Sequence, residues 1–393
     1  MISAVMPTYA RADLAFVQGE GCWLVATDGR RFLDFGAGVA VTAFGHAHPR
    51  LVAALTEQAG KLWHCSNLYR VPGQEKVAQL LIDNSFADTA FFCNSGAEAM
   101  ECALKMARKY QDAVGQPERY RCITIEGAFH GRTLATIAAG GQEKHLKGFD
   151  PIVDGFDQVP FGNMNALRNA ITPQTAAIVV EPIQGEGGIR PAEADYLKKL
   201  RMAADEFGLL LIFDEVQTGM GRTGSLFAYE QAGVAPDVMA LAKGLGGGFP
   251  VGACLASESA AQGMTAGTHG STFGGNPLAM AVAETVIRMM LEPGFLTGVA
   301  ERGAYLHAKL QDVAARHPQS IKSVRGQGLM QGLACARPNG EIVEACYGQG
   351  LLTIMAGDNV VRILPPLIVN HAEIDEGCAK LEAALTTLEC RGA

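Results

Sequence analysis

Short apolar runs alternate with amphipathic segments along the middle of the chain, from about residue 75 to residue 280. The runs are continuously hydrophobic, which is typical of strands that are buried on both faces of a sheet. Such strands are predicted at residues 121–126, 176–182, 209–215, 237–243 and 251–257. The pattern therefore predicts an α/β domain with a mostly parallel sheet that is covered by helices.

The segments between these runs repeat apolar residues at helical spacing. They predict helices over residues 97–110 and 192–207. In the first of these, Met100, Leu104 and Ala107 fall on one face, as in a helix that packs against a sheet. Helices in these positions would connect parallel strands.

The two ends of the chain differ from its middle. An Asp28-Gly29 turn separates two short predicted strands, and residues 351–367 predict a hairpin. Asn370 and Glu373 form a capping box that opens a final helix. We therefore expect a large α/β domain at residues 51–285 and a smaller α+β domain built from residues 1–50 and 286–393.

The composition agrees with a compact protein that has a large core. Of the 393 residues, 48% are hydrophobic and 18% are charged. The net charge of −8 and the absence of dense Lys/Arg blocks argue against a nucleic-acid partner. No long apolar run and no signal-peptide pattern are present in the sequence, so we expect a cytoplasmic protein without a membrane partner.

Neither the cysteines nor the histidines form a convincing metal-binding pattern. The ten cysteines are spread along the chain without a Cys-x-x-Cys pair, so we interpret most of them as small buried thiols. His46 and His48 form a His-x-His pair, but no further cluster of ligands accompanies them. We expect a structural turn there, and no metal.

Polar residues follow several predicted strands at the points where the strands end. They are Glu126, Glu181, Asp214, Glu215 and Lys243. Because ligands of open parallel sheets bind beyond the carboxyl ends of the strands, we expect these side chains to meet in one crevice. A lysine is costly after an apolar run unless it has a use. A P-loop is disfavoured because the glycines follow this lysine instead of preceding it.

An acid and a lysine are the two protein groups that pyridoxal phosphate chemistry requires. The acid keeps the ring nitrogen protonated, and the lysine forms a Schiff base with the aldehyde and later moves a proton. Asp214 and Lys243 suit these roles, although a lone carboxylate at a strand end is more often a cap. A phosphate could bind where a helix begins at Ser95, Gly96 and Ala97, which also suit an ordinary N-cap.

Extended stretches of the chain resemble the class III pyridoxal-phosphate aminotransferases, the family of ornithine and 4-aminobutyrate aminotransferases. The main ones are "LIFDEVQTGMGRTG" and "PDVMALAKGLGGGFPVGA". Others follow in family order over nearly the whole chain: "FGHAHPRL", "NSGAEAMECALKMAR", "FHGRT", "EPIQGEGG", "GSTFGGNPLA" and "RGQGLMQG". The resemblance implies the aspartate-aminotransferase-like fold of PLP-dependent transferases, known as fold type I.

The resemblance also implies roles for individual residues. Lys243 would be the Schiff-base lysine and Asp214 the partner of the pyridinium nitrogen, while Ser95, Gly96 and Ala97 would hold the phosphate. The other implied cofactor-binding residues are Phe129 against the ring, His130 and Val216 in the pocket wall, Gln217 near the phenolic oxygen, and Thr272. Thr272 would reach in from the other subunit of an obligate homodimer.

Two arginines would hold the carboxylates of glutamate or 2-oxoglutarate, because arginine is the natural bidentate partner of a carboxylate. By resemblance, Arg132 takes the distal carboxylate and Arg362 takes the α-carboxylate. Glu186 of the "GEGG" motif would mask Arg362 while an ω-amine donor is bound. Ser271 is a further substrate-binding residue that the resemblance implies.

The stretch "DFGAGVAVTAFGHAHP" (residues 34–49) bears on the amino donor. It carries Val39, Ala40 and Val41 where ornithine aminotransferases usually have a tyrosine, and it resembles acetylornithine aminotransferases, except that Gly36 replaces a bulkier residue. We expect transfer of the δ-amino group of N-acetylornithine to 2-oxoglutarate, giving N-acetylglutamate 5-semialdehyde and glutamate, as in arginine biosynthesis.

Three alternatives stay open at this stage. The donor could be another ω-amine, namely N-succinyl-diaminopimelate, ornithine or 4-aminobutyrate. An aminomutase of the glutamate-1-semialdehyde type would share the fold and the lysine and would need no keto-acid acceptor. A non-catalytic pyridoxal-binding protein is disfavoured because the lysine, the aspartate and both arginines are all present.

Overall fold

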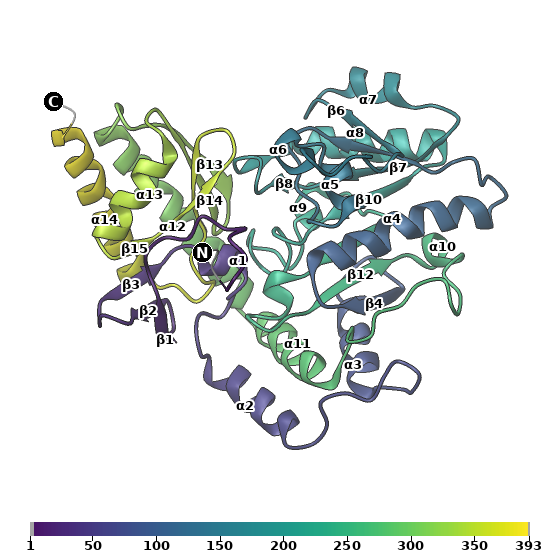
Figure 1. Ribbon diagram of the computed structural model, residues 1–393, viewed down its shortest axis with the longest axis horizontal. Helices are drawn as coiled ribbons and strands as arrows, with labels where there is room; N and C mark the ends of the chain where they lie inside the picture. The colour runs from purple at the N-terminus through teal and green to yellow at the C-terminus, as the bar shows by residue number, and fades with distance from the viewer. Residues whose placement is uncertain (1–3, 392–393) are drawn as a thin grey trace.

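The computed structural model describes residues 4–391. Residues 1–3 and 392–393, which the sequence assigns to the smaller domain, lie outside the described range. The chain forms a larger lobe around a seven-stranded sheet and a smaller lobe in which the N-terminal and C-terminal segments lie side by side (Figure 1).

The sheet of the larger lobe contains all five strands that the apolar runs predict. Its strands are β4 (Thr89–Cys93), β5 (Arg121–Ile125), β6 (Phe156–Val159), β7 (Thr175–Val180), β10 (Leu210–Asp214), β11 (Val238–Leu241) and β12 (Gly252–Ala256). Their order across the sheet is β4-β12-β11-β10-β7-β5-β6. Only β12 is antiparallel to its neighbours, so the predicted α/β class and mostly parallel sheet are confirmed.

Two layers of helices cover this sheet because its central strands are apolar on both faces. Ile212 of β10 packs in the cluster beneath α4 (Gly96–Ala113), whereas Leu211 and Phe213 pack toward α8 (Ala194–Phe207). The other helices of this lobe are α2 (Pro49–Ala59), α3 (Pro72–Ile82), α5 (Leu134–Gly140), α6 (Glu143–Leu146), α7 (Met164–Ala170), α9 (Tyr229–Ala232), α10 (Glu258–Ala261) and α11 (Pro277–Met290). The 3₁₀ helix η1 (Lys243–Leu245) and the hairpin of β8 (Ile183–Gln184) and β9 (Arg190–Pro191) complete it.

The smaller lobe joins both ends of the chain. One sheet has the order β1-β2-β3-β15, in which β3 is parallel to β15, and the other has the order β13-β14-β17-β16. Their strands are β1 (Phe16–Glu20), β2 (Trp23–Ala26), β3 (Arg31–Asp34), β13 (Ile321–Gln327), β14 (Met330–Cys335), β15 (Leu351–Leu352), β16 (Ile354–Ala356) and β17 (Val360–Ile363). The helices are α1 (Ala37–Ala40), α12 (Phe295–Arg316), α13 (Asn339–Gly348) and α14 (His371–Arg391).

Local predictions at the two ends are confirmed. The Asp28-Gly29 turn joins β2 to β3, and β16 pairs with β17 as a hairpin. The Asn370 amide donates to Glu373 Oε2 at 3.0 Å and the Glu373 amide to Asn370 Oδ1 at 2.9 Å, which is the capping box before α14. The domain boundaries at residues 50 and 285 stay a prediction, and residue 285 falls within α11.

The histidine pair and the cysteines have structural surroundings. His46 Nε2 lies 2.8 Å from Asp34 Oδ2, and His48 is the N-cap residue of α2. Eight of the ten cysteines are buried and free. Within residues 4–391, no helix has both the length and the hydrophobicity to cross a bilayer, and no cluster of three potential ligands is arranged around a metal position.

Phe213 is the largest side chain of β10 that packs toward α8, and it is completely buried. We expect Phe213→Ala to destabilise the protein by about 3–5 kcal/mol, because it removes packed apolar volume and leaves a cavity. The midpoint of thermal unfolding measures this loss. Met202→Ala on α8 is the control: Met202 is 67% exposed, so its midpoint should barely move. Equal midpoints for both variants would contradict the packing described here.

Candidate active site

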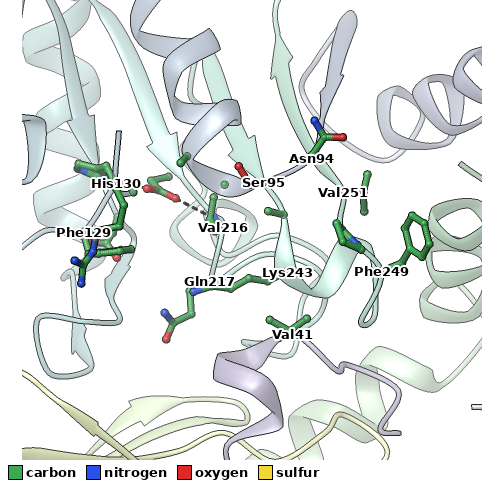
Figure 2. A pocket seen from close by; sticks show the side chains of 18 of the residues that line it. Val41, Asn94, Ser95, Phe129, His130, Val216, Gln217, Lys243, Phe249 and Val251 are labelled. Carbon is green, nitrogen blue, oxygen red and sulfur yellow. Dashed lines mark hydrogen bonds and ion pairs between the residues drawn. The ribbon is translucent and has the colours of Figure 1, made fainter. Parts of the chain in front are cut away.

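A cavity of about 420 Å³ lies at the carboxyl ends of the parallel strands. Lys243 extends into it, with Phe129 and His130 on one side and Phe249 and Val251 on the other (Figure 2). Ser95 lies at the start of helix α4 at the same cavity. The cavity thus brings together residues from several separate parts of the sequence.

Lys243 comes directly after β11, in the short helix η1, with a left-handed φ of 44°. Burial lowers the pKa of its amine to about 8, and the charge of Arg362 acts in the same direction, against the opposing charges of Glu186, Asp214 and Glu181. A lysine with this pKa has a large neutral fraction near pH 8. The neutral amine is the form that attacks an aldehyde carbon.

The glycines after Lys243 shape the turn. A methyl group on Gly246 would overlap the Phe249 carbonyl oxygen, and Gly248 has a φ of 123°. Only glycine allows the backbone to turn this tightly. The turn places Phe249 and Val251 on the wall of the cavity that contains Lys243.

Asp214 reaches the cavity because β10 and β11 are parallel and in register. Asp214 pairs with Ala240, three positions before Lys243. Its Oδ1 accepts a hydrogen bond from the Val216 amide at 3.0 Å, and its Oδ2 lies 2.7 Å from His130 Nδ1. Both side chains are buried, so the aspartate is held in one orientation.

Glu181 and His130 extend this buried charge network. The carboxylate of Glu181 accepts hydrogen bonds from the amides of Phe129 at 3.1 Å and Gly185 at 3.2 Å. Burial and the charge of Asp214 raise the pKa of Glu181. Burial opposes a charge on His130, but its contact with Asp214 and the nearby charge of Glu181 raise its pKa overall.

Two of the five strand-end residues do not enter the crevice, contrary to the sequence prediction. Glu126 is exposed. Glu215 is buried but faces away from the cavity, because its carboxylate accepts the amides of Ala228 at 2.6 Å and Tyr229 at 2.8 Å. Adjacent residues leave a strand in opposite directions, so only Asp214 of the pair lies on the cavity side.

The phosphate-site candidates lie at the N-terminus of the long helix α4. Ser95 is the N-cap residue, and its hydroxyl accepts from the Glu98 amide at 3.2 Å. The first amides of a helix lack intrahelical partners and attract anions. A Cβ on Gly96 would lie 2.7 Å from Val216 Cγ1, so a larger residue would displace the valine from the cavity wall.

Arg362 and Glu186 form an ion pair next to Gln217, which lines this cavity. Arg362 Nη1 donates to Glu186 Oε1 at 2.6 Å and lies 3.4 Å from Gln217 Oε1. Arg362 is buried and its Nε has no partner within the described residues. Arg132, in contrast, is exposed at the mouth of the cavity, 5.6 Å above the Phe129 ring.

Ser271 and Thr272 lie outside the cavity that contains Lys243. They line a separate cavity of about 220 Å³, which shares Asn94 with the larger one. Asn94 Nδ2 donates to Ser271 Oγ at 3.2 Å, and Thr272 is exposed. Within one chain, therefore, Thr272 does not complete the phosphate site.

Sequence reasoning named no site role for some residues that line the cavity. They include Asn94, Phe249, Pro250 and Val251, and also Glu181, which the sequence places in the crevice without a role. Glu181 has the same signal as Asp214, a carboxylate directly after a buried strand. Phe249 and its neighbours carry no chemical signal in the sequence, because only the turn brings them to the site.

Comparison with known proteins identifies the family. The family model described as "Aminotransferase class-III" matches residues 5–385. The chain belongs to this family. Members of the family depend on pyridoxal 5'-phosphate, so the predicted family, fold type and cofactor are confirmed.

Relatives with known names cover almost the entire chain. It is 60% identical to the acetylornithine aminotransferase of Mesorhizobium japonicum, over 97% of this chain and 96% of the relative, and 56% identical to that of Rhodobacter capsulatus over the full length of both. The solved N-acetylornithine aminotransferase of Stenotrophomonas maltophilia is 38% identical with a TM-score of 0.86, covering 98% of each chain. An ornithine aminotransferase structure from Toxoplasma gondii, in which PLP partially occupies the active site, is 31% identical with a TM-score of 0.94. The match covers 99% of this chain and 93% of the other.

The cavity has the chemical groups that pyridoxal phosphate needs. It offers the Lys243 amine for the aldehyde, the Asp214 carboxylate for the ring nitrogen and a helix N-terminus for the phosphate. His130 Nε2, at the same wall, is a buried polar atom without a partner in the described residues. The residues present therefore fit the cofactor.

The lowered pKa of Lys243 generates a test on the cofactor-free protein. We expect trace acetylation of Lys243, followed by mass spectrometry across a pH series, to reach half its maximum near pH 8. The exposed Lys198 is labelled in the same reaction and is the control for an accessible amine. A half-maximum for Lys243 well above pH 8 would contradict the effect of burial.

Proposed function

We propose that this chain transfers the δ-amino group of N-acetylornithine to 2-oxoglutarate, which yields N-acetylglutamate 5-semialdehyde and glutamate. The observation that carries the proposal is the pair of arginines: one is exposed at the cavity mouth and the other is covered by Glu186. The named relatives, which are acetylornithine aminotransferases at 56–60% identity, support the choice of donor.

The two arginines suit a pair of substrates of which both have a carboxylate far from the reacting carbon, but only one has a second carboxylate beside that carbon. Arg132 would hold the carboxylate that lies far from the reacting carbon in both half-reactions. N-acetylornithine has no carboxylate beside its δ-carbon, so Glu186 would then stay paired with Arg362 and leave no buried charge uncompensated. 2-Oxoglutarate has a second carboxylate beside its reacting carbon, and Arg362 would bind it.

Lys243 and Asp214 would carry the proton chemistry. When bound, pyridoxal phosphate supplies an electron sink that stabilises negative charge at the substrate carbon bearing the amino group. Asp214 would keep a proton on the ring nitrogen, and His130, 2.7 Å from its Oδ2, holds the carboxylate in place. The neutral Lys243 amine would take the proton from the substrate carbon and return it later.

The remaining proposed cofactor contacts follow from the walls of the cavity. Ser95, Gly96 and Ala97 would hold the phosphate, and Phe129 and Val216 would lie against the ring. Gln217 would approach the phenolic oxygen. The amide of Phe129 is fixed by Glu181, so Glu181 would set the position of this aromatic ring.

The donor side of the cavity is apolar. Val41, Phe249, Pro250 and Val251 form an apolar wall of the cavity, so a neutral acetamido group that faced this wall would be desolvated at lower cost than a charged ammonium. Of the residues at positions 39–41, Val41 is the one that reaches this wall. The space beside Gly36 is filled by Ile354, whose Cδ1 would lie 2.9 Å from a Cβ at position 36.

A donor panel with 2-oxoglutarate tests the proposed reaction. We expect kcat/KM for N-acetylornithine to exceed that for ornithine by at least about tenfold, because the apolar wall does not compensate an α-ammonium. 4-Aminobutyrate and N-succinyl-diaminopimelate complete the panel. Lys243→Ala is the control for cofactor-dependent turnover and should be inactive. A clear preference for ornithine would overturn the choice of donor.

The panel also separates a transaminase from an aminomutase. Turnover of a single amino-aldehyde without any keto acid, unaffected by Arg362→Gln, would favour the mutase. The pairing of Arg362 with Glu186 favours the transaminase, since a mutase binds no α-keto acid that would use the arginine. We also propose a cytoplasmic location, in agreement with the free cysteines.

We further propose that the enzyme is a homodimer in which Thr272 completes the phosphate site of the partner subunit. Exposed apolar side chains gather near Thr272: Trp63, Leu68, Tyr69 and Phe273 are 60–88% exposed. Asn67 Nδ2 donates to the Ser271 carbonyl at 2.9 Å, which ties the two loops together. An apolar surface of this kind is typical of a protein–protein contact.

The dimer can be tested by changing this surface. We expect Leu68→Asp to convert a dimer into monomers in light scattering and to weaken cofactor retention, because a buried charge is costly at an apolar interface. Met202→Asp on α8 is the matched exposed control and should leave the mass unchanged. A wild-type protein that is monomeric at micromolar concentration would rule out the proposal.

A further inference from the structure

The proposed function, on which this inference rests, requires Glu186 to leave Arg362 when 2-oxoglutarate binds. The Glu186 carboxylate then needs a new position. Arg362 Nη1 and Glu186 Oε1 are 2.6 Å apart, and the arginine side chain is only 3% exposed. A second substrate carboxylate binds Arg362 only after Glu186 has left. The departing carboxylate loses its ion pair, so the open arrangement is costly unless another cation receives Glu186.

The space for such a movement lies on the far side of Glu186. A cavity of about 640 Å³ is lined by Glu186 together with Gln142, Arg190, Arg325 and Asp358. It shares no lining residue with the cavity that contains Lys243. The Glu186 side chain is 30% exposed, which shows that it already faces open space while paired with Arg362.

Of the two arginines in this cavity, Arg325 is occupied. Its Nη2 lies 2.6 Å from Asp358 Oδ2, and its Nε donates to the Gly188 carbonyl at 2.8 Å. These two contacts fix the guanidinium and neutralise Asp358. Arg325 therefore has little charge left to offer Glu186.

Arg190, the other arginine that lines this cavity, has no carboxylate partner among residues 4–391. Its Nη1 makes one long contact, 3.4 Å from Gln184 Oε1, and its guanidinium lies 4.7 Å from the centre of the Phe161 ring. Stacking on an aromatic ring holds the plane of the guanidinium and leaves its N–H edge free. This is the arrangement of an arginine that is able to accept a carboxylate.

Arg190 is the first residue of β9 and directly follows the loop that contains Glu186. Gln184 and Arg190 are paired across the β8–β9 hairpin, so residues 185–189 are its loop. Gly127 lies between the two residues. A Cβ added to Gly127 would be 3.4 Å from Arg190 Nη1, and a Cβ added to Gly187 would be 2.7 Å from the carbonyl oxygen of Gly127. The guanidinium is therefore near Gly187, the residue directly after Glu186.

We propose that Arg190 is a positioning residue that receives Glu186 when the carboxylate leaves Arg362. The glutamate then exchanges one arginine for another, and the net charge of the loop stays balanced in both arrangements. Arg190 lowers the free energy of the open arrangement and so strengthens the binding of the dicarboxylate acceptor. It leaves the donor half-reaction unchanged, because Glu186 remains on Arg362 there.

A double-mutant cycle on the cofactor-loaded enzyme tests the proposal with glutarate, an unreactive dicarboxylate of the same chain length as 2-oxoglutarate. Calorimetry gives its Kd for the wild type, Arg190→Gln, Glu186→Gln and the double variant. We expect Arg190→Gln to raise Kd roughly three- to tenfold when Glu186 is present. In the Glu186→Gln background, the same change should leave Kd unaltered.

Kinetics and matched variants separate positioning from a structural effect. Arg190→Gln should raise KM for 2-oxoglutarate and leave the single-turnover rate with N-acetylornithine unchanged, and Arg190→Lys should restore much of the lost affinity. Arg168→Gln is the control, because Arg168 also stacks on an aromatic ring, Phe207 at 5.3 Å, but does not line this cavity. It should change neither Kd nor KM.

Two results would overturn the role of Arg190: an equal weakening of glutarate binding in both backgrounds, or no weakening in the presence of Glu186. Failure of the proposed function gives a different result. If Arg362→Gln leaves glutarate binding unchanged, the acceptor does not use this arginine, and the reason for Glu186 to move is removed along with the proposed reaction.

Discussion

The parallel pairing of β10 with β11 is the constraint on which the site depends. It places Asp214 opposite Ala240, so an acid and a lysine that are 29 positions apart in the sequence (243 − 214) come to the same edge of the sheet. Both strands are fully buried, and a slip by one residue would turn their apolar side chains to the wrong layer. The packing of the core and the geometry of the chemistry are thus fixed by the same hydrogen bonds.

Buried charge is the second feature that organises the molecule. Asp214 is held by His130, Arg362 by Glu186, and Glu181 by two backbone amides. An unpaired charge in this environment would be costly, so each of these groups needs its partner in order to stay charged while buried. Lys243 has no such close partner among residues 4–391, and burial shifts its pKa toward the neutral form.

The sequence predicts the central strands of the sheet well. These strands are apolar on both faces because both faces are buried, and a continuous apolar run is visible in the sequence. The sequence does not predict β4 and β6, which are partly exposed, and β6 is also mixed in polarity. At the site, residues with a chemical signal, such as Asp214 and Lys243, were found in the predicted cavity. Glu126 and Glu215 were misplaced, because the direction of a side chain at a strand end depends on pleat and on the following loop.

The antiparallel strand β12 has a consequence for how this enzyme could diversify. Because β12 runs against its neighbours, its beginning, and not its end, borders the cavity. The wall at Phe249, Pro250 and Val251 therefore lies within a few positions of Lys243 along the chain. A short insertion or exchange in this one turn would reshape this wall, while Asp214, the start of α4 and both arginines, which belong to other segments, stay in place. The shape of this wall can therefore change without a change in the charged groups of the site.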